Sequence, residues 1–190
     1  MIYLKNMEKS EEALIEKLYT EAFPEVERKP FSMLLRLRKK NKADLWVIHD
    51  SHTEEAVGLA FMLLYRNQVL FDYFAIMKEH RSKGYGKSVL EALADKYAGK
   101  ALFGEVEPLD VEADNYEQRV RRMNFYMENG FHQTGIYVNL FGCVLQLIYM
   151  GETAVTYEEY IKFLKHAFGL FGPYIISKNV SLVKITQEGK

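Results

Sequence analysis

The sequence predicts one mixed α/β domain in which helices alternate with strands. The chain has 190 residues, of which 48% are hydrophobic, and this length suits one substantial core better than two. Helical and strand-like hydrophobic patterns alternate along it without a linker, an internal repeat or a low-complexity segment. Two apolar, aromatic-rich runs around "YRNQ" are typical of a long, largely buried hairpin.

In the first half of the chain we expect two helices, one strand and the hairpin, over residues 10–23, 30–40, 44–50 and 55–77. Ser10 is the expected N-cap of the first helix, and Pro24 ends that helix.

In the second half we expect helices and strands in alternation. A helix runs to about Gly99 and a later one is stopped by Asn129-Gly130, since glycine favours helix ends. Strands are expected over residues 101–108, 131–138 and 143–150. The tail beyond Gly151 contains one further helical segment, "TYEEYIKFLKHAF", and then an apolar stretch broken by "FGPY" that gives no clear prediction.

Composition narrows the function classes. Lys and Arg number 25 against 26 Asp and Glu, so no overall field draws the chain to nucleic acid or to a membrane, and we expect neither partner. No apolar run approaches the roughly 20 residues that span a bilayer, and "MIYLKNMEKSEE" lacks a signal-peptide pattern. The single cysteine, Cys143, excludes an internal disulfide framework, and the five histidines lack metal-binding spacing. We expect a cytoplasmic protein without a metal.

The stretch "HRSKGYGKSVLEAL" is a basic, glycine-punctuated turn that leads into an amphipathic helix. A P-loop requires glycine where this chain has Arg81, and a dinucleotide-binding fingerprint requires glycine where it has Val89. Two glycines in three positions still allow several backbone N–H groups to converge at a helix N-terminus, which favours a pyrophosphate. The alternative is a plain strand-to-helix connection with solvated basic side chains.

Two motifs together resemble the GNAT superfamily of N-acetyltransferases. The run "FAIMKEHRSKGYGKSVLEAL" is similar to its acetyl-coenzyme A signature, and "NFYMENGF" is similar to its downstream aromatic motif. The resemblance covers about residues 1–150 as an acetyltransferase domain and leaves residues 151–190 as a C-terminal extension packed on it. It implies a mixed, mostly antiparallel twisted sheet of six to seven strands with a splayed parallel pair, flanked by about four helices.

The resemblance also implies how acetyl-coenzyme A (acetyl-CoA), the cosubstrate, is held. The backbone of Phe74, Ala75 and Ile76 would pair with the pantetheine arm, in a splay between "VLFDYFAIM" and "ALFGEVEP". The pyrophosphate would be held by the turn and the first turn of the helix, at Arg81, Ser82, Lys83, Gly84, Tyr85, Gly86, Lys87 and Ser88.

Acetyl transfer to an amine needs two proton transfers. By resemblance, Tyr126 is the acid that protonates the departing thiolate, although it is also readable as a core aromatic residue. For the base we favour Glu107 and then Glu105, whose spacing of two puts both on one strand face. Asp72 is a third candidate, and an ordered water is the alternative to a dedicated base.

One position departs from the family pattern. Many members have asparagine seven residues before this tyrosine, where the chain has Arg119. This arginine and its neighbours Arg121 and Arg122 could contact coenzyme phosphate, pair with acids such as Glu117, or solvate an exposed helix face.

We therefore expect an N-acetyltransferase that moves an acetyl group from acetyl-CoA to a primary amine of a small molecule or peptide. Transfer would be direct, in a ternary complex, because Cys143 begins an apolar strand where burial would dull its reactivity. The acceptor would be read partly by "AFPEVERKPF", whose acids suit a cationic amine or are ordinary surface residues. The alternative is a non-catalytic coenzyme-binding or interaction protein on the same scaffold, with the tail forming a homodimer surface.

Overall fold

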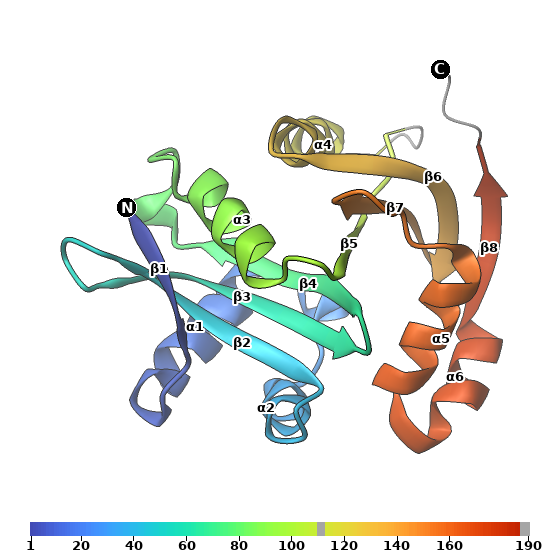
Figure 1. The fold of residues 1–190 in the computed structure, drawn as a ribbon, viewed down its shortest axis with the longest axis horizontal. Coiled ribbons are helices and arrows are strands. Elements are labelled where there is room, and N and C mark those ends of the chain that lie inside the picture. Colours follow the sequence, from blue (N-terminus) through green and yellow to red (C-terminus); the bar gives the residue numbers. More distant parts are fainter. Residues whose placement is uncertain (110–112, 187–190) are drawn as a thin grey trace. The chain divides into compact units, whose positions relative to one another are not determined.

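The computed structural model describes residues 1–109 and 113–186, which fall into two compact units (Figure 1). The first unit consists of Met1–Leu64 and Phe71–Ala98, and the second of Tyr65–Leu70 and the chain from Gly99 onward. Each unit is built from strands and helices in alternation.

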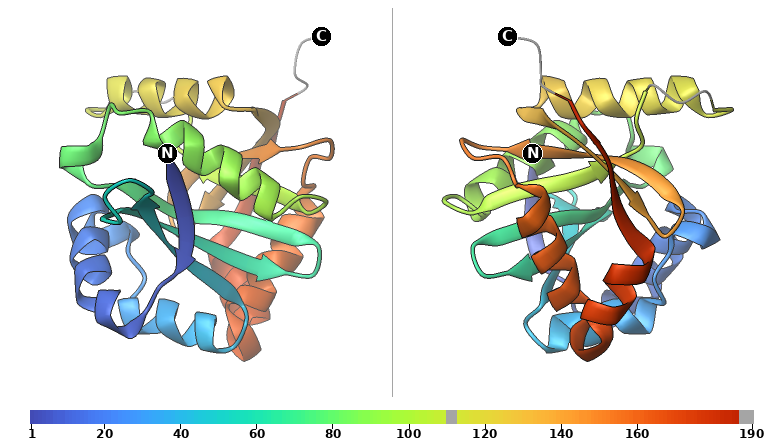
Figure 2. Two further views of the ribbon diagram at one scale, coloured as in Figure 1. Left: turned by 60° about the vertical axis from the view of Figure 1, so that its left-hand side comes forward. Right: turned by 90° about the vertical axis from the view of Figure 1, so that its right-hand side faces the viewer.

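The first unit is a sheet covered by helices on both faces. Its strands are β1 (Ile2–Asn6), β2 (Ala43–Asp50), β3 (Ala56–Tyr65) and β4 (Gln68–Ile76), the last of which starts in the second unit. Its helices are α1 (Glu12–Ala22), α2 (Phe31–Lys39) and α3 (Tyr85–Lys96), with short 3-10 turns η1 (Lys9–Glu11), η2 (Glu25–Glu27) and η3 (Lys78–His80). Strands β1, β2 and β3 pair antiparallel in this order. Figures 1 and 2 show α3 on one face of these strands and α1 and α2 on the other.

Hydrophobic spacing explains the helices of this unit. Helix α1 buries Ile15, Leu18 and Tyr19, which recur at three and four residues and so share one face. The expected N-cap at Ser10 is wrong, because Ser10 lies inside η1 and α1 begins only at Glu12. A capping box between Glu8 and Glu11 opens this segment instead, with the Glu8 N–H donating to the Glu11 carboxylate at 2.7 Å.

The second unit has four strands in the order β5-β7-β6-β8, each antiparallel to its neighbour. They are β5 (Ala101–Val106), β6 (Phe131–Leu140), β7 (Cys143–Met150) and β8 (Val180–Ile185). Its helices are α4 (Tyr116–Glu128), α5 (Tyr157–Ala167) and α6 (Gly172–Asn179), with the 3-10 turn η4 (Gly169–Phe171). Figure 1 shows α4 on one side of β6 and β7 and α5 on the other.

The segment after Gly151 is built into this second unit. Tyr160 and Phe163 of α5 contact the ring of Phe103 on β5 edge-on, with ring centroids 6.3 and 5.1 Å apart. Strand β8 pairs with β6, and this requires Gly135 (φ +72°), where a Cβ would lie 2.2 Å from the Thr186 carbonyl oxygen. Backbone contact at a glycine therefore fixes the last strand on the sheet.

The mixed α/β fold class is confirmed, with more elements than expected. The described residues hold eight strands and six α-helices, compared with the expected six to seven strands and about four helices. The additional elements include β1, α6 and β8. The splay between "VLFDYFAIM" and "ALFGEVEP" involves both units and stays a prediction, as does the domain boundary near residue 150. No helix within residues 1–109 and 113–186 has the length and apolar character to cross a membrane.

Gly172 offers a test of how tightly the C-terminal segment is packed. A Cβ at this buried position would lie 1.9 Å from the Lys165 carbonyl oxygen, which is backbone of α5 and cannot turn away. We expect Gly172→Ala to lower the free energy of unfolding by about 1–3 kcal/mol through overpacking. Urea denaturation checks this, with Lys178→Ala on the exposed face of α6 as the control. An unchanged midpoint for Gly172→Ala would contradict the packing described.

Candidate functional site

The end of β4 presents its backbone groups in a fixed alternation. The Met77 N–H donates to Val57 of β3 at 2.9 Å, and a Cβ at Gly58 would lie 2.5 Å from the Ala75 carbonyl oxygen. Residues 75 and 77 thus face β3. The backbone N–H and C=O groups of successive residues in a strand point to opposite edges. Those of Phe74 and Ile76 therefore face away from β3. Of the three residues expected to bind pantetheine, these two have the orientation for it.

The turn after β4 contains two left-handed residues. Ser82 has φ +61° and Gly84 has φ +81°, and both lie in an exposed segment before α3. Alternation of left-handed and ordinary residues makes a concave arrangement of N–H groups that binds anions. The Arg81 Nε donates to the Ile76 carbonyl at 3.0 Å, which closes the turn onto the end of β4.

Helix α3 begins directly after this turn, with Gly84 as its N-cap residue. The first intrahelical bond in the turn is from the Ser88 N–H to the Gly84 carbonyl, at 3.4 Å. The N–H groups of the helix's first residues precede that bond and have no acceptor inside the helix, so they are available to an anion. Lys87 is exposed and lies 3.9 Å from Glu91, so its ammonium group is only weakly engaged.

Tyr85 is anchored by its side chain. Its hydroxyl donates to the carboxylate of Asp50 at the end of β2, and the backbone N–H groups of His52 and Thr53 donate to the same carboxylate at 2.7 and 3.3 Å. The Tyr85 hydrogen bond, followed by the His52 N–H, lowers the pKa of Asp50 to about 2. The phenol is thereby held on β2, which fixes the position of the Tyr85 backbone at the start of α3.

His80, which the sequence analysis did not single out, lies just before the turn. Its Nδ1 is buried and has no hydrogen-bond partner among the described residues, and its ring meets that of Tyr85 at a centroid distance of 6.2 Å. A buried ring nitrogen without a partner is costly unless a ligand or water satisfies it. The only sequence signal was its position immediately before Arg81.

Asp72 of β4 is engaged by a residue far away in the sequence. Lys29 Nζ lies 2.8 and 2.9 Å from the two carboxylate oxygens of Asp72, and the Asp72 side chain is 6% exposed. The same ammonium group lies 4.9 Å from the centre of the Tyr73 ring. Lys29 comes from the loop between α1 and α2, where sequence reasoning considered only acids.

In the second unit, Glu107 is surrounded by cations. Arg119 and Arg122 of α4 lie 3.0 and 2.8 Å from its two carboxylate oxygens, and Asn115 donates to it at 3.2 Å. Arg119 also donates from Nε to Asn115 Oδ1 at 2.7 Å. These two arginines therefore pair with an acid rather than solvate the helix face. Both carboxylate oxygens of Glu107 are therefore engaged by charge-assisted hydrogen bonds.

Glu105 has a different environment from Glu107. Strand β5 ends at Val106, so the alternation that would place both acids on one face stops before Glu107. The Glu105 carboxylate accepts a hydrogen bond from the Tyr160 hydroxyl of α5 at 2.7 Å. The two acids are thus directed to different helices, α5 for Glu105 and α4 for Glu107.

Tyr126 is half-buried on α4, between the rings of Phe125 and Phe131 at centroid distances of 5.4 and 5.2 Å. Burial raises the pKa of Tyr126 to about 12, with a smaller opposing effect from Arg122. The phenol therefore stays protonated at neutral pH, and it can donate a hydrogen bond or a proton but is not a base.

Two further expectations concern cysteine and metals. Cys143 was expected to be buried, but it begins β7 next to the hairpin turn and is exposed, because β7 buries its interior and not its first residue. Within the part of the chain that the structure describes, no group of three or more His, Cys, Asp or Glu side chains is arranged to hold a metal ion.

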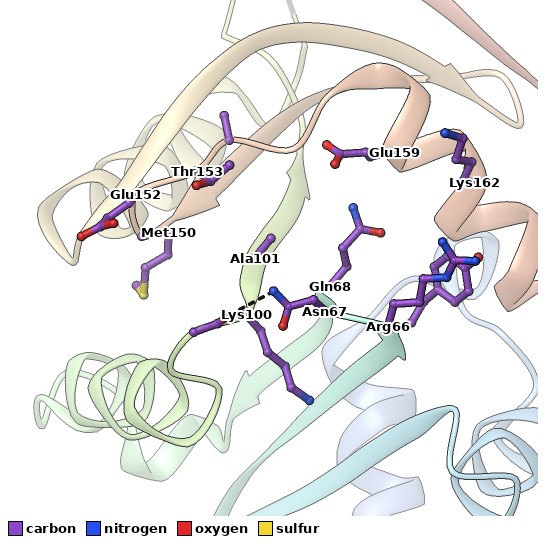
Figure 3. Close-up of a pocket in the computed structure, with 14 residues that line it drawn as sticks. Arg66, Asn67, Gln68, Lys100, Ala101, Met150, Glu152, Thr153, Glu159 and Lys162 are labelled. Carbon is purple, nitrogen blue, oxygen red and sulfur yellow. Dashed lines mark hydrogen bonds between the residues drawn. The ribbon is translucent and has the colours of Figure 1, made fainter.

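A pocket of about 750 Å³ lies within the second unit, at the start of β5 (Figure 3). It is lined by the β3–β4 turn, residues 99–101, residues 150–154 and the α5 side chains Glu159 and Lys162. Two of the lining residues are bonded to each other, since the Asn67 amide donates to the Gly99 carbonyl at 3.1 Å. Glu105 lies four residues further along β5, roughly 13 Å away, so this pocket is separate from the candidate catalytic acids.

Comparison with known families gives a match over the middle of the chain. The family model described as the acetyltransferase (GNAT) domain matches residues 41–133, which include both the glycine turn and "NFYMENGF". No curated protein sequence matches the chain.

Solved structures share the fold. A protein from Bacteroides thetaiotaomicron assigned to the GNAT family of acetyltransferases has a TM-score of 0.72 at 21% identity, over 90% of this chain and 98% of that one. Spermidine N-acetyltransferase from Vibrio cholerae, solved with CoA and spermine, has a TM-score of 0.61 at 18% identity, over 78% and 94%. A dodecameric structure of that Vibrio enzyme has a TM-score of 0.60 at 17% identity, over 78% and 92%.

The anchoring of Tyr85 predicts a pH dependence. The pKa of Asp50 is about 2 in the folded chain and close to 3.9 when unfolded, so its contribution to stability is complete above about pH 4. The contribution should be lost as the pH falls from about 4 towards 2. We expect wild-type protein to lose unfolding free energy relative to Asp50→Asn over this range, measured by urea denaturation at each pH. Parallel curves for the two proteins would contradict the assignment.

Proposed function

Because the chain carries a GNAT acetyltransferase domain, we propose that it moves an acetyl group from acetyl-CoA to a primary amine of a small molecule or peptide, directly and within a ternary complex. The turn after β4 is the observation that carries this proposal. Its two left-handed residues, its exposure and the helix start behind it favour the binding of an anion such as a pyrophosphate.

The described residues fit the other parts of acetyl-CoA as well. The peptide groups of Phe74 and Ile76 face away from β3, so they are oriented to hydrogen-bond the amides of a pantetheine arm as an added strand would. The N–H groups of the turn and the start of α3, from Ser82 to Ser88, would hold the diphosphate, with Lys83 and Lys87 adding charge. His80 Nδ1, buried and unpartnered among the described residues, is an additional candidate contact.

The reaction forms one bond and breaks one. The amine nitrogen attacks the thioester carbonyl, the C–N bond forms, the C–S bond breaks, and coenzyme A leaves as a thiolate. The amine must first lose a proton, because an alkylamine has a pKa of about 10. We propose Glu105, directly or through water, as the acceptor of that proton ahead of Glu107, since both oxygens of Glu107 are engaged by arginines.

Tyr126 is the proposed donor to the departing thiolate. Its pKa of about 12 keeps the hydroxyl protonated throughout the working range, so the hydroxyl always carries a proton to donate when the C–S bond breaks. The high pKa also means that Tyr126 gives no titration in a rate profile between pH 6 and about pH 10.

An amine as acceptor is supported by the solved structures of similar fold. The Vibrio cholerae protein is a spermidine N-acetyltransferase, and its crystals hold CoA and spermine. At 18% identity this supports the class of acceptor and not the polyamine itself.

The alternative is a coenzyme-binding or interaction protein without catalysis. Thermal shift with acetyl-CoA distinguishes the cases first, because a ligand that binds only the folded state raises the melting temperature. Release of free thiol across a panel of primary amines then reports transfer. An unchanged melting temperature at saturating acetyl-CoA would overturn both the acetyltransferase and the coenzyme-binding protein. A raised melting temperature without thiol release in the presence of any amine would favour the coenzyme-binding protein.

Location in the cytoplasm and self-association remain predictions. One of the similar solved structures is dodecameric. The C-terminal segment of this chain exposes several large apolar side chains, at Leu170, Phe171, Tyr174, Leu182, Val183 and Ile185. These support the homodimer surface expected for the tail.

Gly84 tests the cradle. A Cβ there meets no atom within 4 Å, so a larger side chain should leave the packing intact while it enters the space of the phosphates and strains a left-handed residue. We expect Gly84→Val to weaken acetyl-CoA binding about 100-fold or more in isothermal titration calorimetry. Gly142→Val is the matched control, because Gly142 also has positive φ (+90°) and open space but lies in the β6–β7 turn. Equal affinity of the two variants would refute the cradle.

Tyr126 tests the proton donor. Tyr126→Phe keeps the ring between Phe125 and Phe131 and removes only the hydroxyl. We expect kcat to fall by about 10²-fold, within the range for loss of a general acid, with little change in the KM for acetyl-CoA. Thiol release under steady-state conditions measures both constants. An undiminished kcat would remove Tyr126 from the mechanism.

A further inference from the structure

The loop between α1 and α2 brings an alkylammonium group of the chain itself onto Asp72. Lys29 Nζ donates to both carboxylate oxygens, at 2.8 and 2.9 Å, and lies 4.9 Å from the centre of the Tyr73 ring. A carboxylate and an aromatic face around one ammonium group are the combination by which proteins recognise alkylammonium ligands. The Lys29 side chain is 27% exposed, so this arrangement is open to solvent on one side.

The aromatic wall behind this pair is well packed. The Tyr73 ring meets those of Tyr19 and Phe23 edge-on, each at a centroid distance of 4.9 Å, and that of Phe61 at 6.3 Å. Burial, followed by the side-chain interaction with Tyr73, raises the pKa of Tyr19 far above its usual value, so its phenol stays neutral. The Tyr73 ring is therefore held by aromatic packing that does not involve the Lys29 side chain.

The loop is held in place by bonds that do not use the Lys29 side chain. The Tyr19 hydroxyl donates to the Lys29 carbonyl at 3.0 Å, and the Lys29 N–H donates to the Tyr73 hydroxyl at 3.2 Å. The Tyr73 hydroxyl in turn donates to the Glu27 carbonyl at 2.8 Å. The ammonium group can thus leave Asp72 while the loop backbone stays where it is.

Asp72 also lies close to the proposed cosubstrate site. It precedes Phe74 by two residues on β4, which is about 7 Å along the strand and on the same side-chain face. Under the proposed function the Phe74 backbone binds the pantetheine arm, so an amine bound at Asp72 would lie about 7 Å along the strand from that contact.

We propose that Asp72 and the face of Tyr73 form the subsite for the ammonium group of the acceptor, and that Lys29 fills this subsite until an acceptor displaces it. This rests on the proposed function and narrows the acceptor to a primary alkylammonium ion with a slender chain, similar to a lysine side chain. Lys29 then acts as an internal competitor, which raises the concentration of amine needed for binding.

Removal of Lys29 tests the subsite without any transfer reaction. Lys29→Ala removes the ammonium group and the three carbons beyond Cβ. We therefore use n-butylammonium chloride, which has the length and charge of a whole lysine side chain, as the probe, without acetyl-CoA. We expect saturable millimolar binding to Lys29→Ala by calorimetry and at least tenfold weaker binding to wild type. The Lys29→Ala/Asp72→Asn variant should show none, and 1-butanol, which lacks the charge, should bind none of the proteins. Equal binding by all three proteins would overturn the subsite.

Kinetics test its role in acceptor binding. With any amine that the wild type acetylates, Lys29→Ala should lower the acceptor KM about tenfold, because the internal competitor is gone. Lys17→Ala, which removes an exposed lysine of α1, should leave KM unchanged. An unchanged or higher KM in Lys29→Ala would show that the Lys29–Asp72 pair is only structural. If Lys29→Ala fails to fold, Lys29→Met keeps the side-chain stem over Tyr73 and removes the charge. The binding probe is then ammonium chloride, which replaces only the lost ammonium group.

The two proposals fail in distinguishable ways. Absence of thiol release from every amine would refute acetyl transfer, while n-butylammonium binding would still decide whether Asp72 and Tyr73 form an ammonium site.

Discussion

The candidate site in the first unit depends on the contacts that fix the chain between the end of β4 and the start of α3. At that point an edge of the strand, a turn with two left-handed residues and the start of α3 must meet within about ten residues. Gly58 on β3 makes the approach possible, because a Cβ there would lie 2.5 Å from the Ala75 carbonyl oxygen. Arg81 closes the turn onto Ile76, and Tyr85 ties the helix start to Asp50. Each contact fixes a backbone segment next to the turn.

The three candidate acids differ in the residues that bind their carboxylates. Glu107 is bound by arginines of α4, Glu105 by a tyrosine of α5, and Asp72 by a lysine of the chain's own loop. A carboxylate that is paired with a cationic side chain can bind an amine only when that side chain can be displaced. Lys29 belongs to a loop that is held independently of its side chain, whereas the two guanidinium groups on Glu107 come from consecutive turns of one helix.

The sequence predicted the elements whose signals are local. The hairpin, α3 and α4 follow from hydrophobic spacing and glycine stops, and the glycine turn follows from residue types alone. Strand β1 was missed because its residues are mostly half-buried and show no clear alternation, and β8 because its side chains are largely exposed and its place depends on Gly135, some 45 residues earlier. Local patterns contain no information on such pairings.

The site was predicted to the same extent. The turn could be read from "RSKGYG", because backbone conformation at glycine is a local property. The partners of Asp72 and Glu107 could not, because Lys29 and Asp72 are 43 residues apart and the α4 arginines read equally well as surface residues. Charge pairing across such separations is set by the fold.

Amide chemical shifts with and without coenzyme A test the central claim most directly. If the turn cradles the pyrophosphate, the largest changes in a two-dimensional NMR spectrum of the first unit's amides should fall on Ser82 to Lys87, together with Phe74 and Ile76. Changes of that size confined to other residues, or none at saturating coenzyme A, would contradict the account.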